Sequence, residues 1–380
     1  MSSVVRVRRA TSRIRLAATC LLVTLSAACV GATGVSRVED GGPVLASSTT
    51  ATTAPSATTA STPATTSTTT PAPTTTTTQP RGPLVIHAAG DLNIDPGYIP
   101  ALVANGYDHA LAGLDGLFTT DDLTLVNLEC TPSDVGVRQD RPFNFRCGTD
   151  GLGALTDGGV EVVSLANNHA MDYGPDALVD GLGQVRAAGL VPVGAGADRT
   201  SAFAPAFVER NGWRIAVVGF GGVYLATNWL ATDAADGLAA QPGISDGLDL
   251  DATTAAVTAA AADADLVIVT VHWCCELETT PNARNRAHTE AWLAAGADIV
   301  IGHHQHRLQP LELVDGHPVA WGLGNFVWPR FSAAGSDTAV ARIEVAPDGA
   351  VTACLLDATI VSHGHPTLDD PTRRTCAPAG

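Results

Sequence analysis

The feature that most constrains the fold is a series of short apolar runs, rich in Val, Ile and Leu, each of which stops at polar side chains. Continuous apolar runs are typical of strands that are buried on both faces, as in parallel sheets. The runs, with the polar residues that follow them, are 84–89 with Asp91 and Asn93, 123–126 with Asn127 and Glu129, 160–165 with Asn167, Asn168 and His169, 266–271 with His272, 297–301 with His303, His304 and His306, and 319–323 with Asn325.

The segments between several runs predict helices. In residues 175–189, apolar side chains recur at helical spacing between a Pro at the start and a Gly at the end. Residues 252–262 and 283–295 are alanine-rich, which indicates helix propensity more than a buried face. With a further strand at 214–218, the pattern predicts an α/β layered domain. Open α/β sheets bind ligands outside the carboxyl ends of their strands, so we expect the polar clusters to converge on one site.

The N-terminus has the pattern of an export signal. A basic stretch precedes an apolar run at residues 16–30, which is shorter than the roughly 18 to 20 residues that a membrane-spanning helix needs. We predict that residues 1–28 are a signal peptide. Cys29 follows two alanines, as in a bacterial lipobox, although Ser26 stands where an aliphatic residue is usual. We therefore expect an exported protein anchored at the cell surface by a lipid on Cys29, and secretion is the alternative.

A low-complexity segment follows the signal. Residues 46–83 are almost wholly Thr, Ser, Ala and Pro, a composition that cannot bury enough apolar surface to fold. The sequence therefore predicts a stalk over residues 29–83, a folded domain over residues 84–366 and a C-terminal tail over residues 367–380.

The charge of the chain restricts its partners. The formal net charge is −17, from 21 Lys+Arg and 38 Asp+Glu, and no lysine is present. This balance argues against nucleic acid as a partner. An anionic substrate would need a locally positive site on this acidic chain.

Disulfides are expected because an even number of cysteines lies beyond the signal region of a chain predicted to reach an oxidising compartment. The nearest pairings along the sequence are Cys130 with Cys147 and Cys354 with Cys376, although spacing alone does not determine connectivity. The adjacent cysteines at 274–275 stay ambiguous.

Clustered histidines and carboxylates indicate a metal site. His303, His304 and His306 lie at one strand end, and the rings of His304 and His306 would point to the same side of an extended segment. The other strand ends add two carboxylates, one amide and one imidazole, a set that suits two borderline-soft divalent ions such as Mn, Zn or Fe. The predicted metal ligands are Asp91, Glu129, Asn168, His272, His304 and His306.

Seven motifs at these strand ends follow one another in a recognisable order. They are Gly90-Asp91, Asn127-Leu128-Glu129, Ala166-Asn167-Asn168-His169, Asp172-Tyr173-Gly174, His272-Trp273, Gly302-His303-His304-Gln305-His306 and Gly324-Asn325-Phe326. Their order and spacing resemble the CapA family of capsule-synthesis proteins, which looks like a branch of the calcineurin-like metallophosphoesterases. The resemblance implies a metallophosphoesterase-like four-layer sandwich, in which two facing mixed sheets are flanked by helices.

The resemblance also implies how the two metals are shared. One ion would be held by Asp91 and His306 and the other by Asn168, His272 and His304, with Glu129 as the bridge.

Two further residues gain catalytic roles from the resemblance. His169 would donate a proton to the leaving group, and Asp172 would hold its ring. A loop with Phe143, Phe145, Arg138, Arg141 and Arg146 resembles a segment that covers the substrate, and Arg146 could bind an anion. The alternative for these arginines is a solvated loop tied down by a Cys130 to Cys147 disulfide.

Two positions depart from the family pattern. After His-Trp the family usually has a glycine, with a glutamate one residue further on. This chain has Cys274 and Cys275 between Trp273 and Glu276. The two cysteines could form a vicinal disulfide, pair with the loop of Cys130 and Cys147, or supply soft metal ligands. Asn93 stands where typical metallophosphoesterases have a histidine ligand, so one ion could be held weakly, or the site could be mononuclear or inactive.

Two functions from different classes follow. The first is an extracytoplasmic metal-dependent hydrolase or transferase that acts on a phosphoester or on the anionic polymer poly-γ-glutamate, because two metal ions can activate water and stabilise an oxyanion. The second is a surface factor that binds or tethers an anionic capsular polymer without catalysis. The expected partners are that polymer or phosphoester, the cell envelope through a lipid anchor, and capsule-synthesis membrane proteins.

Overall fold

The computed structural model describes residues 80–224, 227–372 and 375–376. The predicted signal peptide, Cys29 and all but the last four residues of the predicted stalk lie outside these ranges. Within the described ranges, no helix combines the length and the apolar character needed to cross a membrane.

The first sheet is mixed. Strands β1 to β4 run parallel to one another, while the last three strands of the chain extend the sheet beyond β1 in antiparallel pairs. A short strand, β13, also pairs with β1. Among the described residues the strands follow the order β16 (His365–Leu368), β15 (Val351–Ser362), β14 (Asp337–Val345), β1 (Leu84–Leu92), β2 (Leu123–Leu128), β3 (Val162–Ser164) and β4 (Val191–Val193), with β13 (Asn325–Val327) off this path.

The second sheet is also mixed. Its central strands are parallel, and an antiparallel strand closes each edge. The described strands follow the order β11 (Leu311–Val314), β12 (His317–Ala320), β10 (Ile299–His303), β9 (Leu266–His272), β7 (Trp213–Gly221) and β6 (Ala206–Arg210). A two-stranded ribbon pairs β5 (Ala195–Gly196) with β8 (Gly243–Ile244).

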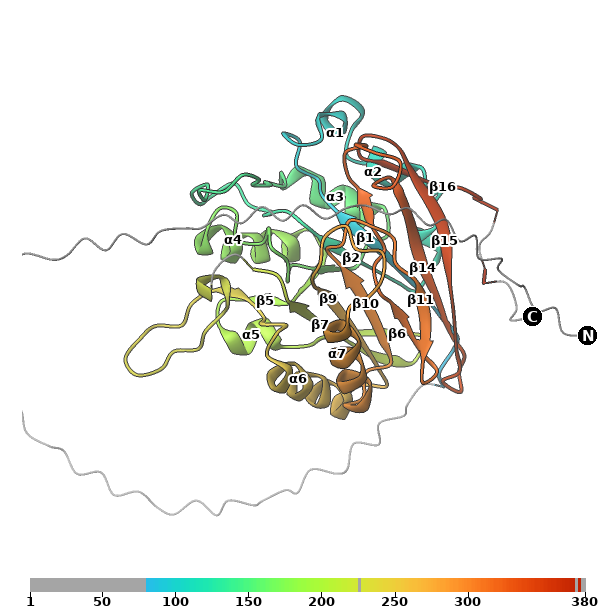
Figure 1. Ribbon diagram of the computed structural model, residues 1–380. Coiled ribbons are helices and arrows are strands. Elements are labelled where there is room, and N and C mark those ends of the chain that lie inside the picture. The colour runs from blue at the N-terminus through green and yellow to red at the C-terminus, as the bar shows by residue number, and fades with distance from the viewer. Residues whose placement is uncertain (1–79, 225–226, 373–374, 377–380) are drawn as a thin grey trace, which may run out of the picture. The chain divides into compact units, whose positions relative to one another are not determined.

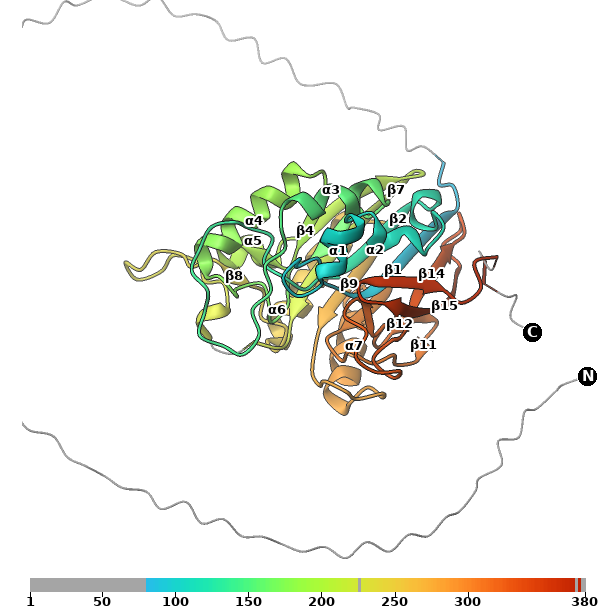
Figure 2. The same ribbon diagram turned by 90° about the horizontal axis from the view of Figure 1, so that it is seen from above.

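Helices cover the outer face of each sheet (Figures 1 and 2). The first sheet carries α1 (Pro100–Asn105), α2 (His109–Ala112), α3 (Asp150–Asp157) and α4 (Pro175–Ala187), with a 3₁₀ turn at Phe118–Thr120. The second sheet carries α5 (Arg199–Phe203), α6 (Leu250–Asp263) and α7 (Ala283–Ala294), and a second 3₁₀ turn spans Thr227–Trp229.

The alternation of side chains along each strand separates the layers. On β1, Ile86 packs between the two sheets whereas Leu92 packs toward the helices. On β9, Ile268 packs between the sheets whereas Val267 and Val269 pack toward α6 and α7. Since successive side chains of a strand point to opposite faces, each sheet is buried on both sides. The predicted four-layer α/β sandwich is confirmed.

Local expectations differ from the structure at three places. The strand expected at 319–323 ends earlier, because β12 stops at Ala320 and Asn325 instead begins β13 beside Asp91. The histidine segment is not extended: β10 ends at His303, and φ is 95° at His304 and 51° at His306. The boundary expected at residue 366 falls inside β16.

Candidate metal centre

The carboxyl ends of four strands meet between the two sheets. Strand β1 contributes Asp91, the residue after β2 is Glu129, β9 ends at His272, and the turn after β10 carries His304 and His306. Gly90 is required before Asp91, since a Cβ there would collide with the carbonyl oxygen of Gly324. The structure thus brings together five of the six predicted metal ligands. The sixth, Asn168, contacts this group through His272, because its Oδ1 lies 2.8 Å from His272 Nε2.

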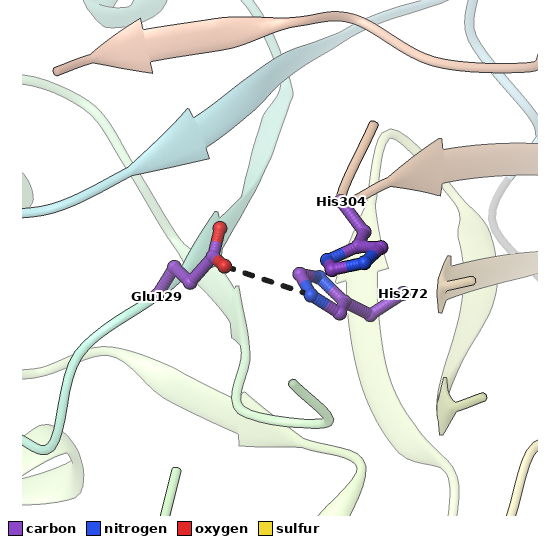
Figure 3. A group of neighbouring side chains, drawn as sticks. All are labelled: Glu129, His272 and His304. Carbon is purple, nitrogen blue, oxygen red and sulfur yellow. Dashed lines mark ion pairs between the residues drawn. The ribbon is translucent and has the colours of Figure 1, made fainter. Parts of the chain in front are cut away.

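The ligand atoms form three overlapping groups, two of which share Glu129. In one group Glu129, His272 and His304 offer atoms that all lie within 4.8 Å of one another (Figure 3). In the other group Glu129 is joined by Asp91 and His306 within the same limit. Glu129 belongs to both of these groups, as its predicted role as the bridge requires.

Short contacts define each half of the centre. His306 Nδ1 lies 3.2 Å from Asp91 Oδ2, and His306 Nε2 lies 4.0 Å from Glu129 Oε1. On the other half, His272 Nε2 lies 3.6 Å from Glu129 Oε1. The rings of His272 and His304 are 4.6 Å apart between centroids.

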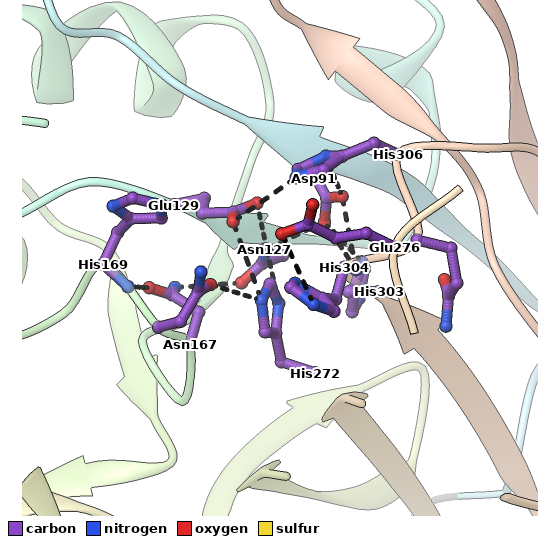
Figure 4. Close-up of polar contacts among 12 residues, drawn as sticks. Asp91, Asn127, Glu129, Asn167, His169, His272, Glu276, His303, His304 and His306 are labelled. Carbon is purple, nitrogen blue, oxygen red and sulfur yellow. Dashed lines mark hydrogen bonds and ion pairs between the residues drawn. The ribbon is translucent and has the colours of Figure 1, made fainter. Parts of the chain in front are cut away.

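Asn127 connects the two halves, a role that the sequence did not reveal. Its Nδ2 lies 2.9 Å from Asp91 Oδ1, 3.3 Å from Glu129 Oε2 and 3.2 Å from His272 Nδ1 (Figure 4). Its Oδ1 accepts a hydrogen bond from Asn167, which fixes the orientation of the amide. The buried amide therefore holds both carboxylates and one imidazole in place.

The residues fit metal ions because several of their buried polar atoms have no hydrogen-bond partner. Among the described residues these atoms include Glu129 Oε1 and His304 Nδ1 and, next to them, both ring nitrogens of His303. Buried polar groups are almost always paired, so a cluster of unpaired ligand atoms indicates a site for a cation.

The pKa values of the site reflect its burial and its crowded charges. Burial opposes a charge on His306, yet the carboxylates of Glu129 and Asp91 raise its pKa to about 9. Burial and the nearby His306 lower the pKa of His304 to about 3. Burial and the charge of Asp91 hold the pKa of Glu129 well above its usual range. Perturbed groups of this kind cluster at functional sites.

The two predicted catalytic residues lie against each other at the edge of the centre. His169 Nδ1 is 2.7 Å from Asp172 Oδ2, and both side chains are buried. Asp172 also accepts hydrogen bonds from Arg141 and from the backbone N–H of Phe145. Burial lowers the pKa of His169 although the charge of Asp172 opposes this shift.

A disulfide between Cys130 and Cys147 closes the loop that carries Arg146. This pairing was predicted under the alternative in which the loop arginines are solvated. The side chain of Arg146 contacts Tyr173 and the loop itself. Its guanidinium stacks 3.7 Å from the Tyr173 ring centroid and donates to the carbonyl of Val135. The expectation that Arg146 binds an anion therefore has no support from its contacts.

The two departures from the family pattern are resolved differently. Cys274 and Cys275 form a vicinal disulfide, so they neither ligate a metal nor pair with other cysteines. Next to them Glu276, which the sequence-based ligand set omitted, forms a third possible group of ligands with His304 and His306. Asn93 is buried and its Oδ1 accepts from the backbone N–H of Asp95, so it turns away from a ligand role.

Fold and site together define a metallophosphoesterase-like protein, with helices flanking two mixed sheets and His, Asp and Glu side chains gathered at the strand ends. Residues 85–330 match the family described as "Bacterial capsule synthesis protein PGA_cap", and the chain belongs to this family.

Curated relatives carry related names. The chain is 30% identical over 250 residues to "PGA biosynthesis protein CapA" of Bacillus subtilis, a match that covers 64% of this chain and 63% of the relative. It is 29% identical to "Capsule biosynthesis protein CapA" of Bacillus anthracis, over 56% of this chain and 51% of the relative. It is 33% identical to a "Probable polyglutamine synthesis accessory protein" of Mycobacterium tuberculosis, over 58% of this chain and 59% of the relative. The chain thus spans about half to three-fifths of these relatives.

Proposed function

We propose that this protein is an extracytoplasmic, metal-dependent hydrolase or transferase that acts on an anionic ester or polymer. The observation that carries the proposal is the pair of ligand groups that share Glu129. Asp91 and His306 would hold one divalent ion, while Asn168, His272 and His304 would hold the other. Nitrogen and oxygen ligands in this mixture suit Mn, Zn or Fe.

Two divalent ions would activate water and stabilise negative charge that develops on the substrate. Two ions bring four positive charges and the two carboxylates remove two, so the site would be locally positive despite the acidic chain. The remaining ligands are neutral imidazoles and an amide. This local field favours an anionic substrate.

The protein's own acid and base groups lie beside the ligands. Asp172 fixes the ring of His169 through Nδ1, which leaves Nε2 of His169 to exchange a proton with the substrate's leaving group. Arg141 balances the buried charge of Asp172. Asn127 keeps the two carboxylates oriented without taking part in proton transfer.

The names of the curated relatives support poly-γ-glutamate as the substrate, and a phosphoester is the alternative that the site chemistry supports. An exported protein with a lipid on Cys29 would work at the outer face of the cell envelope. It would meet the polymer there, beside capsule-synthesis membrane proteins.

A second candidate function is binding of the polymer without turnover. Asn93 favours it, because this buried amide replaces the histidine ligand expected of a metallophosphoesterase and hydrogen-bonds its own turn. One of the two ions would then be held by fewer ligands than a catalytic pair requires.

Metal analysis and turnover assays on the purified protein test the proposal. We expect about two Mn, Zn or Fe ions per chain and hydrolysis of a phosphodiester mimic or of poly-γ-glutamate. Asp91→Asn should abolish activity and the binding of one of the two metal ions. His169→Ala should lower kcat by about 10²- to 10⁴-fold and leave the metal content of the protein unchanged. Turnover that neither substitution changes would contradict the catalytic assignment, and polymer binding without turnover would favour the second candidate.

A further inference from the structure

A pocket of about 310 Å³ opens directly beside the predicted centre, where His169 and His306 form part of its wall. Its volume lies at the lower end of the roughly 300 to 1,000 Å³ that small-ligand sites occupy. It therefore has room for one ring-sized group next to the reacting atoms. Five aromatic side chains line it, namely Tyr98, Phe143, Phe145, Trp328 and Phe331.

The aromatic side chains form a continuous wall. The ring centroids of Tyr98 and Phe145 are 4.4 Å apart, and Trp328 meets both edge-on at 5.8 and 5.7 Å. These three rings pack against one another through apolar contacts. At its rim Phe143 and Phe331 are 62% and 70% exposed and offer open faces to a ligand.

A buried hydrogen-bond acceptor in the same pocket has no partner. Asn325 is 5% exposed, and its Nδ2 donates to the carbonyl of Gly335 at 3.0 Å. This bond fixes the amide so that Oδ1 is an acceptor, and Oδ1 has no hydrogen-bond partner among the described residues. A ligand that fills the pocket is thus expected to bring a donor, such as a hydroxyl group.

Apart from His169 and His306 of the centre, the charged groups that line the pocket are one guanidinium and one carboxylate. Arg307 donates to the carbonyl of His306 at 2.6 Å, and Glu276 supplies the carboxylate. A segment of polyglutamate would bring one carboxylate per residue to this wall of rings. An uncharged ring that carries hydroxyls fits both the apolar wall and the free acceptor better.

We propose that the pocket binds a pyranose ring that adjoins the anionic reacting group, so that the substrate or the acceptor of a transfer reaction is a glycosyl compound. The apolar C–H face of the sugar would lie on Phe331 and Tyr98, and a hydroxyl would donate to Asn325 Oδ1. This inference rests on the phosphoester form of the proposed function, since it assumes that an anionic group of the glycosyl compound is held by the neighbouring metal centre.

Three phosphonates that resist hydrolysis test the inference by calorimetric titration of the Mn²⁺-loaded full chain. Glucopyranosylmethylphosphonate, cyclohexylmethylphosphonate and hexylphosphonate share the anion and differ in ring and hydroxyls. We expect the glucosyl compound to bind about 5- to 10-fold more tightly than the other two. Phe331→Ala should weaken the glucosyl compound about fivefold and Phe331→Tyr should restore it, whereas Phe207→Ala, on the surface of β6, should have no effect.

The outcomes separate the two proposals. Equal binding of all three phosphonates, or tightest binding of the cyclohexyl compound, would overturn the glycosyl assignment and leave the metal centre intact. Failure of all three to bind would overturn the anion site and the glycosyl assignment together. Glucosyl binding that Phe331→Ala leaves unchanged would place the sugar elsewhere and also overturn the inference.

Discussion

Asn127 is the residue on which the geometry of the two carboxylates depends. Its amide contacts Asp91, Glu129 and His272 at once. Asn127→Ala should therefore weaken Mn²⁺ binding by about 10- to 100-fold, as expected when a partner of a metal ligand is lost. It should also reduce the free energy of unfolding by about 1 to 3 kcal/mol, because buried polar atoms lose their partner.

Calorimetric titration with Mn²⁺ and urea denaturation measure the two effects of Asn127→Ala. Asn105→Ala is a matched control, since Asn105 is exposed and donates only to the carbonyl of Ala101. If Asn127→Ala kept wild-type metal affinity, the carboxylates would hold their positions without the amide.

Single residues show why the sequence revealed the candidate ligands but not their support. Asp91, Glu129 and His272 follow apolar strands, and the rule that strand ends share one edge of a sheet predicts their meeting. In the sequence Asn127 was one more polar residue at the end of a strand. The spacing of residues does not show which side chains hydrogen-bond to one another, so its supporting role could not be predicted. Glu276 was not included among the ligands because it lies in an irregular loop, where periodicity says nothing about direction.

At the scale of elements, the disulfide between Cys130 and Cys147 holds the loop that carries Phe143 and Phe145 beside the centre. The double variant Cys130→Ser/Cys147→Ser should lose about 3 kcal/mol of stability, the amount expected for a closed loop of roughly this length. The melting temperature should fall by about 6 to 12 °C. Trypsin should cut after Arg138 or Arg141 faster than in the wild type, because the loop opens.

Cys354→Ser/Cys376→Ser is the matched control for this prediction. Its sequence separation of 22 is close to the 17 of the first bridge, so a similar loss of stability is expected. Cys354 lies on β15 and this bridge does not close the loop that carries Arg138, so cutting after Arg138 should stay slow. Equal proteolysis of both variants would mean that global unfolding, and not the loop, exposes the arginines.

The elements were predictable where one periodicity dominated. The apolar runs that became β1, β2, β9 and β10 are buried on both faces, and α4 has clear end signals. Strand β14 is mostly buried and β15 is mostly half-buried or exposed, and neither strand leads to one of the polar clusters, so the pattern of polar strand ends did not predict them. The turn after β10 was predicted as extended because positive φ at His304 and His306 leaves no mark in a run of histidines.

At the scale of the whole molecule, the assignment of layers came from the family resemblance and not from periodicity. Both sheets consist of similar apolar runs, and nothing in their composition says which runs pair. The described strands divide into β1 to β4 with β13 to β16 in one sheet and β6, β7 and β9 to β12 in the other, while β5 and β8 form a separate ribbon. The centre lies where the ends of both sets meet, so the intact sandwich is needed to assemble it.

Because the ligands come from both sheets, metal binding should stabilise the whole fold. A ligand at 100 times its Kd adds about 2.7 kcal/mol to the free energy of unfolding, which corresponds to a rise of about 5 to 10 °C in melting temperature. We expect this difference between the Mn²⁺-loaded protein and the protein in EDTA, measured by calorimetry. Equal melting temperatures would contradict metal binding by the folded state.

Glu129→Gln separates the metal effect from the fold itself. Burial and Asp91 raise the pKa of Glu129, so its contribution to stability in metal-free protein is present below the ordinary glutamate pKa of about 4.3 and is lost as the pH rises through the folded pKa. A neutral isostere avoids that loss. In EDTA at pH 7 the variant should therefore melt at the wild-type temperature or above it, and Mn²⁺ should no longer raise that temperature. A variant that melts lower in EDTA but still responds to Mn²⁺ would show that Glu129 supports the fold and does not bridge the ions.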